Sequence, residues 1–492
     1  MDPVTFTGSI GGRDADAGPR HGWVWAVLPA DCRRVEVIGD AELGILLRAA
    51  GVRDVTDVSA SPDAPRADAI LIGDDRGGIG DLDPLARRLE PGGVLALTVG
   101  GNAPRTERAS VLRRALQEAG VPARALATRR EARRLRHRLD AAGLQTRLIP
   151  TGERWGVHPL GIGDAHAFAA RGAIVAGSAG EERPGVLERA LYEAGEALGG
   201  TPGIVDATVR GSGALLVRIS TADAGDRILR LAAGPAARLL DLSVGNLRAI
   251  EAAGSDAIRE RLVLPLAEGN AGLARWAVER MIPGRHPGRM RSALWRECLD
   301  FLIALRSVQV GEGTAAQQGV ADGLAADARA LTPHLDDRER STLQELERSL
   351  HDRLVELPLG WAHGDFWAGN LLARRGRLMA VIDWDAARPS GLPLLDLLHL
   401  IALGERRTRR LPHGRRCSEA LWPLARDGGD ERVRAYCEAT GTPGDLDTLE
   451  ALAIAYWLSR VGRDLRTFAD RAGRRTWMAE NVHRPLAALG NR

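Results

Sequence analysis

The stretch "WAHGDFWAGNLLARRGRLMAVIDWD", residues 361–385, restricts the possible folds of this chain more than any other segment. It places one histidine, one asparagine and three aspartates among apolar runs that are typical of buried strands. Burying a carboxylate is costly unless a cation or a transferred proton compensates its charge. The stretch therefore predicts a site that binds a metal ion or moves a proton, in a fold that brings these polar groups together.

The hydrophobic pattern upstream of this stretch is typical of a small antiparallel sheet. Short apolar runs separated by glycine-containing turns predict five strands, and one helix interrupts them. A Pro-Gly break after the last strand resembles a hinge, and the chain beyond about residue 288 is mostly helical apart from the motif. The strands are expected over 204–220 (two strands and a turn), 226–234, 261–269 and 272–284, with the helix over 237–254.

Two linked motifs give this order of elements a family resemblance. "HGDFWAGN" fits the H-G-D-x4-N loop of the aminoglycoside phosphotransferase and choline kinase family, whose members are relatives of the protein kinases. "VIDWDAARPSGLPLLDL" (381–397) fits that family's following segment. The resemblance covers roughly residues 200–485. It implies an α+β bilobal protein-kinase-like fold, with an N-lobe over 201–287 and a helical C-lobe over 288–492.

The resemblance also implies roles for the motif residues. Asp365 is expected to accept the proton of a substrate hydroxyl or to orient that hydroxyl, while His363 holds the loop by hydrogen bonds. Asn370 and Asp383 are expected to offer hard oxygen ligands to Mg²⁺. A hairpin with its turn at 374–376 would return Asp383 to the side of Asp365. Asp396 is expected to tie the loop to the helix that follows.

The nucleotide-binding residues implied by the resemblance lie in and beside the antiparallel sheet. Arg230 stands where protein kinases use a lysine, and its alternative role is surface packing. Glu251 is the expected acidic partner on the helix, although another register puts Asn246 there. A turn at 211–213 would cover the phosphates, or it is an ordinary hairpin turn. The full expected set for the nucleotide is Gly211, Ser212, Gly213, Arg230, Glu251 and Met281, the last of these at the hinge.

The N-terminal part of the chain has a different pattern. Strands and helices alternate from residue 21 to about 150, and this predicts an α/β Rossmann-like domain over 1–150 with a parallel, doubly wound sheet. The strands are expected over 33–39, 54–59, 67–73 and 94–101, and the helices over 41–51, 82–93 and 106–143. Residues 151–200 are predicted to be a connecting segment.

This N-terminal domain resembles a degenerate class I methyltransferase. The resemblance lies in "LDPLARRLEPGGVLALTV", residues 82–99. The loop after the first strand has only Gly39 and Gly44, whereas a cofactor loop is richer in glycine. Binding of S-adenosylmethionine is therefore an alternative, and a docking or scaffolding role is preferred.

The composition excludes some functions. The net charge is only +3, so neither a nucleic acid nor a membrane partner is predicted. All 67 basic residues are arginine, and the four cysteines form no CxxC pair. The N-terminus lacks the pattern of a signal peptide, and no apolar run is long enough for a membrane span. A reducing cytoplasm is the simplest expectation.

These observations predict an ATP- and Mg²⁺-dependent kinase that phosphorylates a hydroxyl of a sugar-like or biosynthetic metabolite. The arginine cluster over 403–416 is unlike the acidic lining expected for polycationic aminoglycosides, so a neutral or anionic acceptor is favoured; alternatively the cluster is a solvated loop. A bifunctional methyltransferase–kinase and a pseudokinase that binds nucleotide or a partner without transfer remain alternatives. The sequence predicts no oligomeric state.

Overall fold

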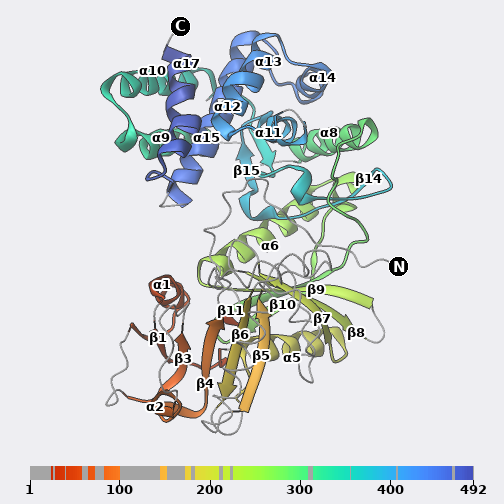
Figure 1. Cartoon of the computed structure of the whole chain (residues 1–492). Helices are drawn as coiled ribbons and strands as arrows, with labels where there is room; N and C mark the ends of the chain where they lie inside the picture. Colours follow the sequence, from red (N-terminus) through yellow and green to blue (C-terminus); the bar gives the residue numbers. More distant parts are fainter. Residues whose placement is uncertain are drawn as a thin grey trace, which may run out of the picture. The chain divides into compact units, whose positions relative to one another are not determined.

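The structure is a computed structural model, and its described residues form two compact units (Figure 1). The sheet unit lies within Asp14–Asp241 and adds Leu264–Met281, whereas the helical unit contains Leu242–Val263 and Ile282–Arg492. The residues described are 24–25, 28–38, 40–57, 65–72, 83–99, 145–151, 172–178, 183–209, 214–221, 225–308, 314–354, 356–405, 408–467 and 471–490.

The sheet unit begins with a six-stranded mixed sheet in the order β2-β1-β3-β4-β6-β5. The first four strands in this order run parallel, as the alternating pattern predicts, whereas β6 pairs antiparallel with both β4 and β5. The elements are β1 (Arg34–Ile38), α1 (Ala41–Ala49), β2 (Asp54–Asp57), β3 (Ala67–Ile72), α2 (Asp83–Ala86), β4 (Leu89–Val99), β5 (Gln145–Thr151) and β6 (Gly172–Ser178).

Two predictions for this region differ from the structure. The helix expected over 82–93 is limited to Asp83–Ala86, because Leu89 already pairs with Ala67 and an irregularity in the β3–β4 register accommodates the Pro-Gly-Gly turn. The segment 151–200, expected to be a connection, contains β6 of the sheet. Its helix α5 (Val186–Leu198) ends at Gly199, as the amphipathic pattern over 185–200 and its two closing glycines predict. The helix expected over 106–143 lies outside the described residues.

The second sheet of this unit has five antiparallel strands in the order β10-β11-β9-β8-β7, as the turn pattern predicts. Alternate residues of β8 are buried, so one face of that strand points into the core. The elements are β7 (Gly203–Val209), β8 (Leu215–Thr221), β9 (Gly225–Ala233), α6 (Pro235–Ala253), β10 (Pro265–Ala271) and β11 (Ala274–Arg280). The strand expected from residue 261 begins at Pro265, after the short helix α7 (Asp256–Arg259).

One continuous hydrophobic core joins the two sheets of this unit. It contains residues from β1, β3 and α1 together with residues of α5, β8, β9 and β11. The indole of Trp276 on β11 donates a 3.0 Å hydrogen bond to Glu193 of α5. The chain also approaches itself closely at Gly272 (φ +60°), where a Cβ would lie 2.0 Å from the carbonyl oxygen of Ala30. The N-terminal sheet and the five-stranded sheet are therefore packed as one body.

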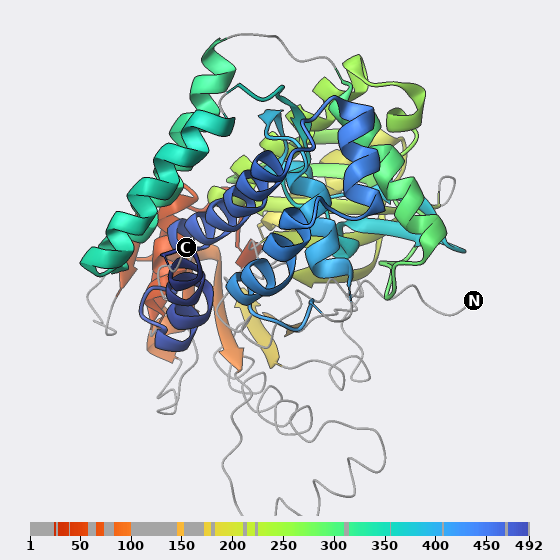
Figure 2. The same ribbon diagram turned by 90° about the horizontal axis from the view of Figure 1, so that it is seen from above.

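The helical unit consists mainly of long helices, and α9 runs alongside α15 (Figure 2). The four cysteines of the chain are free and buried. Among the described residues, no helix combines the length and apolarity that crossing a membrane requires. The elements are α8 (Ser292–Arg306), α9 (Thr314–Leu331), α10 (Asp337–Leu354), β12 (Gly360–Ala362), β13 (Leu371–Arg374), β14 (Arg377–Val381), β15 (Arg388–Gly391), α11 (Leu395–Gly404), α12 (His413–Arg416), α13 (Trp422–Arg426), α14 (Glu431–Thr440), α15 (Leu446–Thr467), α16 (Arg475–Met478) and α17 (Arg484–Gly490).

Candidate functional site

The motif folds as a loop followed by a tight hairpin, all within the helical unit. The loop follows β12, and Gly364 is needed there because its φ is +76° and a Cβ would lie 2.3 Å from the Ala386 carbonyl oxygen. Strands β13 and β14 pair antiparallel, with positive φ angles at Arg375 (52°) and Gly376 (81°) in the turn. The hairpin and the position of its turn are confirmed.

His363 and Asp396 hold the loop in place. The backbone N–H groups of His363 and Gly364 donate to the two carboxylate oxygens of Asp396, at 2.7 and 2.9 Å, which confirms the expected structural role of Asp396. The buried imidazole of His363 accepts from the Asp365 N–H at Nδ1 (3.2 Å), and its Nε2 lies 3.1 Å from the Ile382 carbonyl oxygen. Because a carbonyl only accepts, Nε2 carries the proton, and His363 positions Asp365 from inside the core.

Asn370 links the two aspartates of the motif. Its side-chain N–H₂ donates to the backbone oxygen and to Oδ2 of Asp365, both at 2.9 Å. Its backbone oxygen accepts a 2.9 Å hydrogen bond from Ile382, the residue before Asp383. Asp383 has a left-handed backbone (φ 71°, ψ 63°), an uncommon conformation for a residue other than glycine. The structure thus joins Asp365, Asn370 and Ile382, the residue directly before Asp383, in one hydrogen-bonded network.

The other oxygen of Asp365 contacts two arginines and one histidine that the sequence reasoning missed. Arg460 Nη1 donates to Oδ1 at 2.6 Å, and Arg463 Nη2 and His399 Nε2 each lie 3.4 Å from it. Burial favours the neutral form of Asp365, but the charge of Arg460 and the contact with His399 outweigh burial and hold the pKa of Asp365 well below its ordinary value. Asp365 is therefore ionised at neutral pH.

His399 on α11 is a neutral member of this cluster. It is 6% exposed, and its Nδ1 lies 2.8 Å from the hydroxyl of Tyr456. Burial, and then the nearby charge of Arg460, lower the pKa of His399 to about 4. The sequence signal for Arg460 and Arg463 was the run "AYWLSRVGRDLR", in which a buried helix face of α15 ends in arginines three residues apart.

Two arginines of the cluster over 403–416, Arg415 and Arg416, have structural contacts instead. Arg416 is 7% exposed and donates to the carbonyl oxygens of Thr408, Arg409 and Leu411. Arg415 forms an ion pair with Glu419 at 2.8 Å. These contacts stabilise the turn before α12, so neither side chain is a free cation for an acceptor.

The residues expected to bind the nucleotide are divided between the two units. Gly211, Ser212 and Gly213 lie outside the described residues. Arg230 on β9 forms an ion pair with Glu279 of the neighbouring strand β11, at 3.2 Å, and Met281 directly follows that strand. These residues belong to the sheet unit.

The expected acidic partner of Arg230 lies in the other unit. Glu251, at the end of α6, accepts from Arg259 through its backbone oxygen (2.9 Å), and its pairing with Arg230 stays a prediction. Asn246, the alternative at that position, donates from its side chain to the backbone oxygens of Trp384 and Ala387, at 2.9 and 3.0 Å. Asn246 therefore anchors α6 to the turn directly after Asp383.

The oxygens around Asn370 and Asp383 fit a hard divalent cation. Both N–H bonds of the Asn370 amide point at Asp365, which leaves its side-chain oxygen available as a ligand. Among the described residues, no cationic side chain forms an ion pair with the Asp383 carboxylate. No cluster of three His, Cys, Asp or Glu side chains suited to a metal occurs among the described residues. An amide and a carboxylate oxygen nevertheless match Mg²⁺, which commonly takes one or two protein ligands and completes its shell with phosphates and water.

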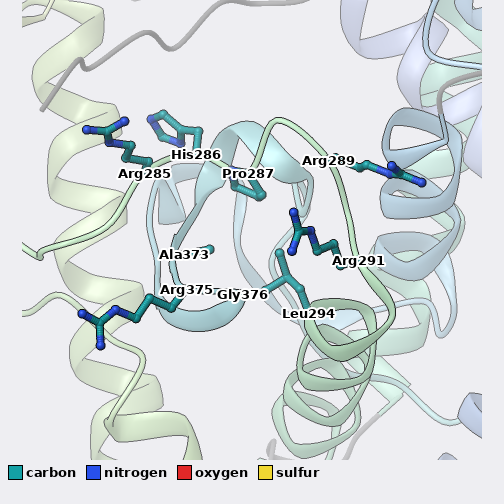
Figure 3. Close-up of a pocket in the computed structure, with 9 residues that line it drawn as sticks. All are labelled: Arg285, His286, Pro287, Arg289, Arg291, Leu294, Ala373, Arg375 and Gly376. Carbon is teal, nitrogen blue, oxygen red and sulfur yellow. The ribbon is translucent and has the colours of Figure 1, made fainter.

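A second basic region lies at the opposite end of the hairpin. A cavity of about 360 Å³ is lined by the segment that follows β11, the start of α8 and the β13–β14 turn. Figure 3 shows the Arg291 guanidinium turned toward the middle of this cavity, whereas Arg285, Arg289 and Arg375 extend outward from its rim. All four side chains are exposed, and within the described residues none of them forms an ion pair.

Residues 206–449 match the model of the phosphotransferase enzyme family, and this confirms the resemblance predicted from the motifs. No curated protein matches the chain. Several solved structures are similar to part of it, with low identity. One is a thermostable mutant of aminoglycoside phosphotransferase APH(4)-Ia in a ternary complex with ADP and hygromycin B (14% identity, 61% of this chain and 98% of that chain, TM-score 0.42). Another is the macrolide 2'-phosphotransferase MphH from Brachybacterium faecium (15% identity, 57% and 90%, TM-score 0.36).

Proposed function

Because residues 206–449 belong to the phosphotransferase enzyme family, we propose that this chain is an ATP- and Mg²⁺-dependent kinase that phosphorylates a hydroxyl group of a small metabolite. The observation that supports this proposal most directly is the network of Asp365, Asn370 and the Ile382–Asp383 backbone. It joins a group that can receive a hydroxyl proton to oxygens that can bind a cation, and phosphoryl transfer needs both.

The reaction joins the acceptor oxygen to the terminal phosphorus of ATP while the bond from that phosphorus to the bridging oxygen breaks. The acceptor becomes a phosphate ester, ADP leaves, and Asp365 receives the hydroxyl proton and passes it to solvent. The Mg²⁺ ion, when bound, neutralises the phosphate charges. Asn370 and Asp383 would hold the ion, and His363 and Asp396 would keep Asp365 aimed at the acceptor.

The low pKa of Asp365 determines how this residue would act. A carboxylate that Arg460 keeps ionised is a weak base, so it cannot remove the hydroxyl proton early in the reaction. It can still accept a hydrogen bond from the hydroxyl and take the proton late, as the bond to phosphorus forms. A loose transition state, in which little charge develops on the attacking oxygen, suits this arrangement.

The test is ATP turnover with a panel of hydroxylated metabolites, followed by mass spectrometry of the products. Wild type is expected to form ADP and a phosphorylated acceptor only when Mg²⁺ is present. Asp365→Asn should lower kcat by about 10²–10⁴-fold. A control is Arg348→Gln, which changes an exposed arginine of α10 that lies outside the motif. ATP binding without any phosphorylated product would favour the pseudokinase alternative instead.

A methyltransferase activity is the second candidate function, and it would use the N-terminal sheet. The strand order β2-β1-β3-β4 in its parallel part reverses between β1 and β3. Open parallel sheets bind ligands at such topological switch points. The residues directly after β1 and β3 lie outside the described residues. A bifunctional methyltransferase–kinase would require S-adenosylmethionine to raise the melting temperature of the whole chain in a manner that ATP does not. No shift at millimolar S-adenosylmethionine would exclude it and leave the docking role.

A further inference from the structure

Two arginines of α15 lie against the carboxylate proposed to face the acceptor. Arg460 and Arg463 are three residues apart and therefore neighbours on one helix face. Both reach the same atom, Asp365 Oδ1, at 2.6 and 3.4 Å. Arg460 is 13% exposed and Arg463 40%, so the pair extends from the buried side of Asp365 to solvent.

Asp365 is the one carboxylate that both arginines contact among the described residues. One carboxylate faces two guanidinium groups, and His399 beside them is neutral because burial lowers its pKa to about 4. Two further carboxylates interact with Arg460: Asp396, which holds the loop, and Asp464 on the same helix. Burial raises the pKa of Asp464, an effect that the charges of Arg471 and Arg460 oppose. Asp365 alone therefore does not compensate the two arginines.

The two guanidinium groups also have hydrogen-bond donors to spare. Each guanidinium carries five N–H bonds in a planar fork. Within the described part of the chain, Asp365 is the one hydrogen-bond partner of either group. The remaining N–H bonds can form paired hydrogen bonds with a carboxylate or phosphate, which are strong and directional.

We propose that the acceptor is an anionic hydroxylated metabolite, whose carboxylate or phosphate group is bound by Arg460 and Arg463 while its hydroxyl faces Asp365. This inference rests on the proposed kinase function. Binding the anion at α15 would fix the hydroxyl beside Asp365 and give the remaining guanidinium N–H bonds an anionic partner. A polycationic aminoglycoside would be repelled at the same position. Both arginines lie after residue 449, where the family match ends.

The first experiment compares matched acceptors that differ in charge. Glycerate is compared with glycerol, glucose 6-phosphate with glucose, and kanamycin serves as the cationic member. ADP release and the phosphorylated product are measured for wild type, Arg463→Gln, Arg463→Lys and the control Arg348→Gln. We expect turnover to favour the anionic member of a pair. Arg463→Gln should raise KM for that acceptor about tenfold and leave kcat within about threefold, since one charge-assisted pair is lost. Arg463→Lys should recover part of the loss.

The second experiment measures binding without turnover. Glycerate and glucose 6-phosphate are titrated calorimetrically into the full chain without nucleotide, in wild type and Arg463→Gln. Anion binding that Arg463→Gln weakens about tenfold supports the inference even if no product forms, and in that case the kinase function alone fails. Turnover that favours glycerol, glucose or kanamycin would overturn the inference while the kinase function stands. Equal binding of charged and neutral compounds, or an unchanged affinity in Arg463→Gln, would also overturn it.

Discussion

The helical unit has two groups of arginines that differ in what surrounds them. On α15, Arg460 and Arg463 contact Asp365, and Arg466 lies 2.6 Å from Asp327 of α9. At the cavity beside the β13–β14 turn, four exposed arginines have no ion pair among the described residues. The first group is partly buried against carboxylates, whereas the second is solvated. In a chain whose basic residues are all arginine, the number of arginines in a segment therefore says little, and their burial and partners distinguish the functional ones.

The largest effect is expected at the proposed Mg²⁺ site beside Asp365. Asp383→Asn should remove the anionic ligand proposed for Mg²⁺ and lower kcat by about 10²–10³-fold, the range typical of losing one electrostatic contact to the transition state. The measurement is ATP turnover as a function of Mg²⁺ concentration, with exposed Asp427→Asn as the matched control. Turnover with unchanged Mg²⁺ dependence would contradict the role of Asp383.

The next prediction tests whether Arg460 affects catalysis more than an ordinary surface arginine does. Arg460→Gln removes the charge that lowers the pKa of Asp365, so this pKa should rise. Since the reaction requires ionised Asp365, activity on the acidic side should be lost at a higher pH than in wild type. We also expect kcat at neutral pH to fall about tenfold, because the carboxylate is no longer held in one orientation. The pH profile of kcat/KM checks this, and an acidic limb at the wild-type position would show that Arg460 is merely structural.

The Asp327–Arg466 pair gives a smaller effect, on stability. Burial raises the pKa of Asp327 to about 6, even though Arg466 and Arg388 act in the opposite direction. A raised pKa means that the folded state binds the Asp327 proton more tightly than the unfolded state does. Protonation of Asp327 therefore contributes its full stabilisation of the folded state below the ordinary pKa of an aspartate, and this contribution is lost as the pH rises through about 6.

Relative to Asp327→Asn, which cannot titrate, wild type should therefore lose stability between pH 4 and pH 6.5, by roughly 2 kcal/mol. Urea unfolding of both proteins across this range provides the measurement. A stability difference that does not change with pH would show that the ion pair with Arg466 controls the ionisation of Asp327.

The smallest effect is expected at the cavity. Arg291→Gln combined with Arg375→Gln should change kcat/KM by less than about twofold and leave the melting temperature nearly unchanged, as is usual for exposed charges without partners. The assay and acceptor are those used for Arg463→Gln. A larger loss than Arg463→Gln would reverse the contrast between the two groups.

The motif could be read from the sequence because its chemistry is local. Asp365, Asn370 and Asp383 lie within 19 residues, and a two-stranded hairpin with a predictable turn brings them together. Arg460 could not be found in this way, since it reaches Asp365 across 95 positions of chain and through the packing of α15. The ion pair of Arg230 with Glu279 was missed for a related reason: the helical register indicated Glu251, whereas the strand register put a carboxylate on the neighbouring strand.

The N-terminal sheet was predicted well in its parallel strands and less well at its margin. Strands β3 and β4 contain the apolar runs "AILI" and "VLAL", which parallel pairing favours, and β1 ("RVEVI") carries three apolar residues. Strand β6, "GAIVAGS", is rich in glycine and alanine, and this composition is more typical of a loop. Its pairing with β4 depends on a neighbour more than 70 positions earlier in the sequence.

The shared interior of the sheet unit has a consequence for anyone who wishes to study the phosphotransferase region by itself. A version shortened to begin near residue 201 would strip away α5 and the first sheet, and the apolar side chains of Leu215, Leu231 and Val278 would lose part of their cover. Such a fragment should aggregate or melt early even though every motif residue is retained. The described part of the chain before residue 200 shares its interior with the five-stranded sheet, and we expect the fold of that sheet to depend on it, whether or not it ever binds a small molecule.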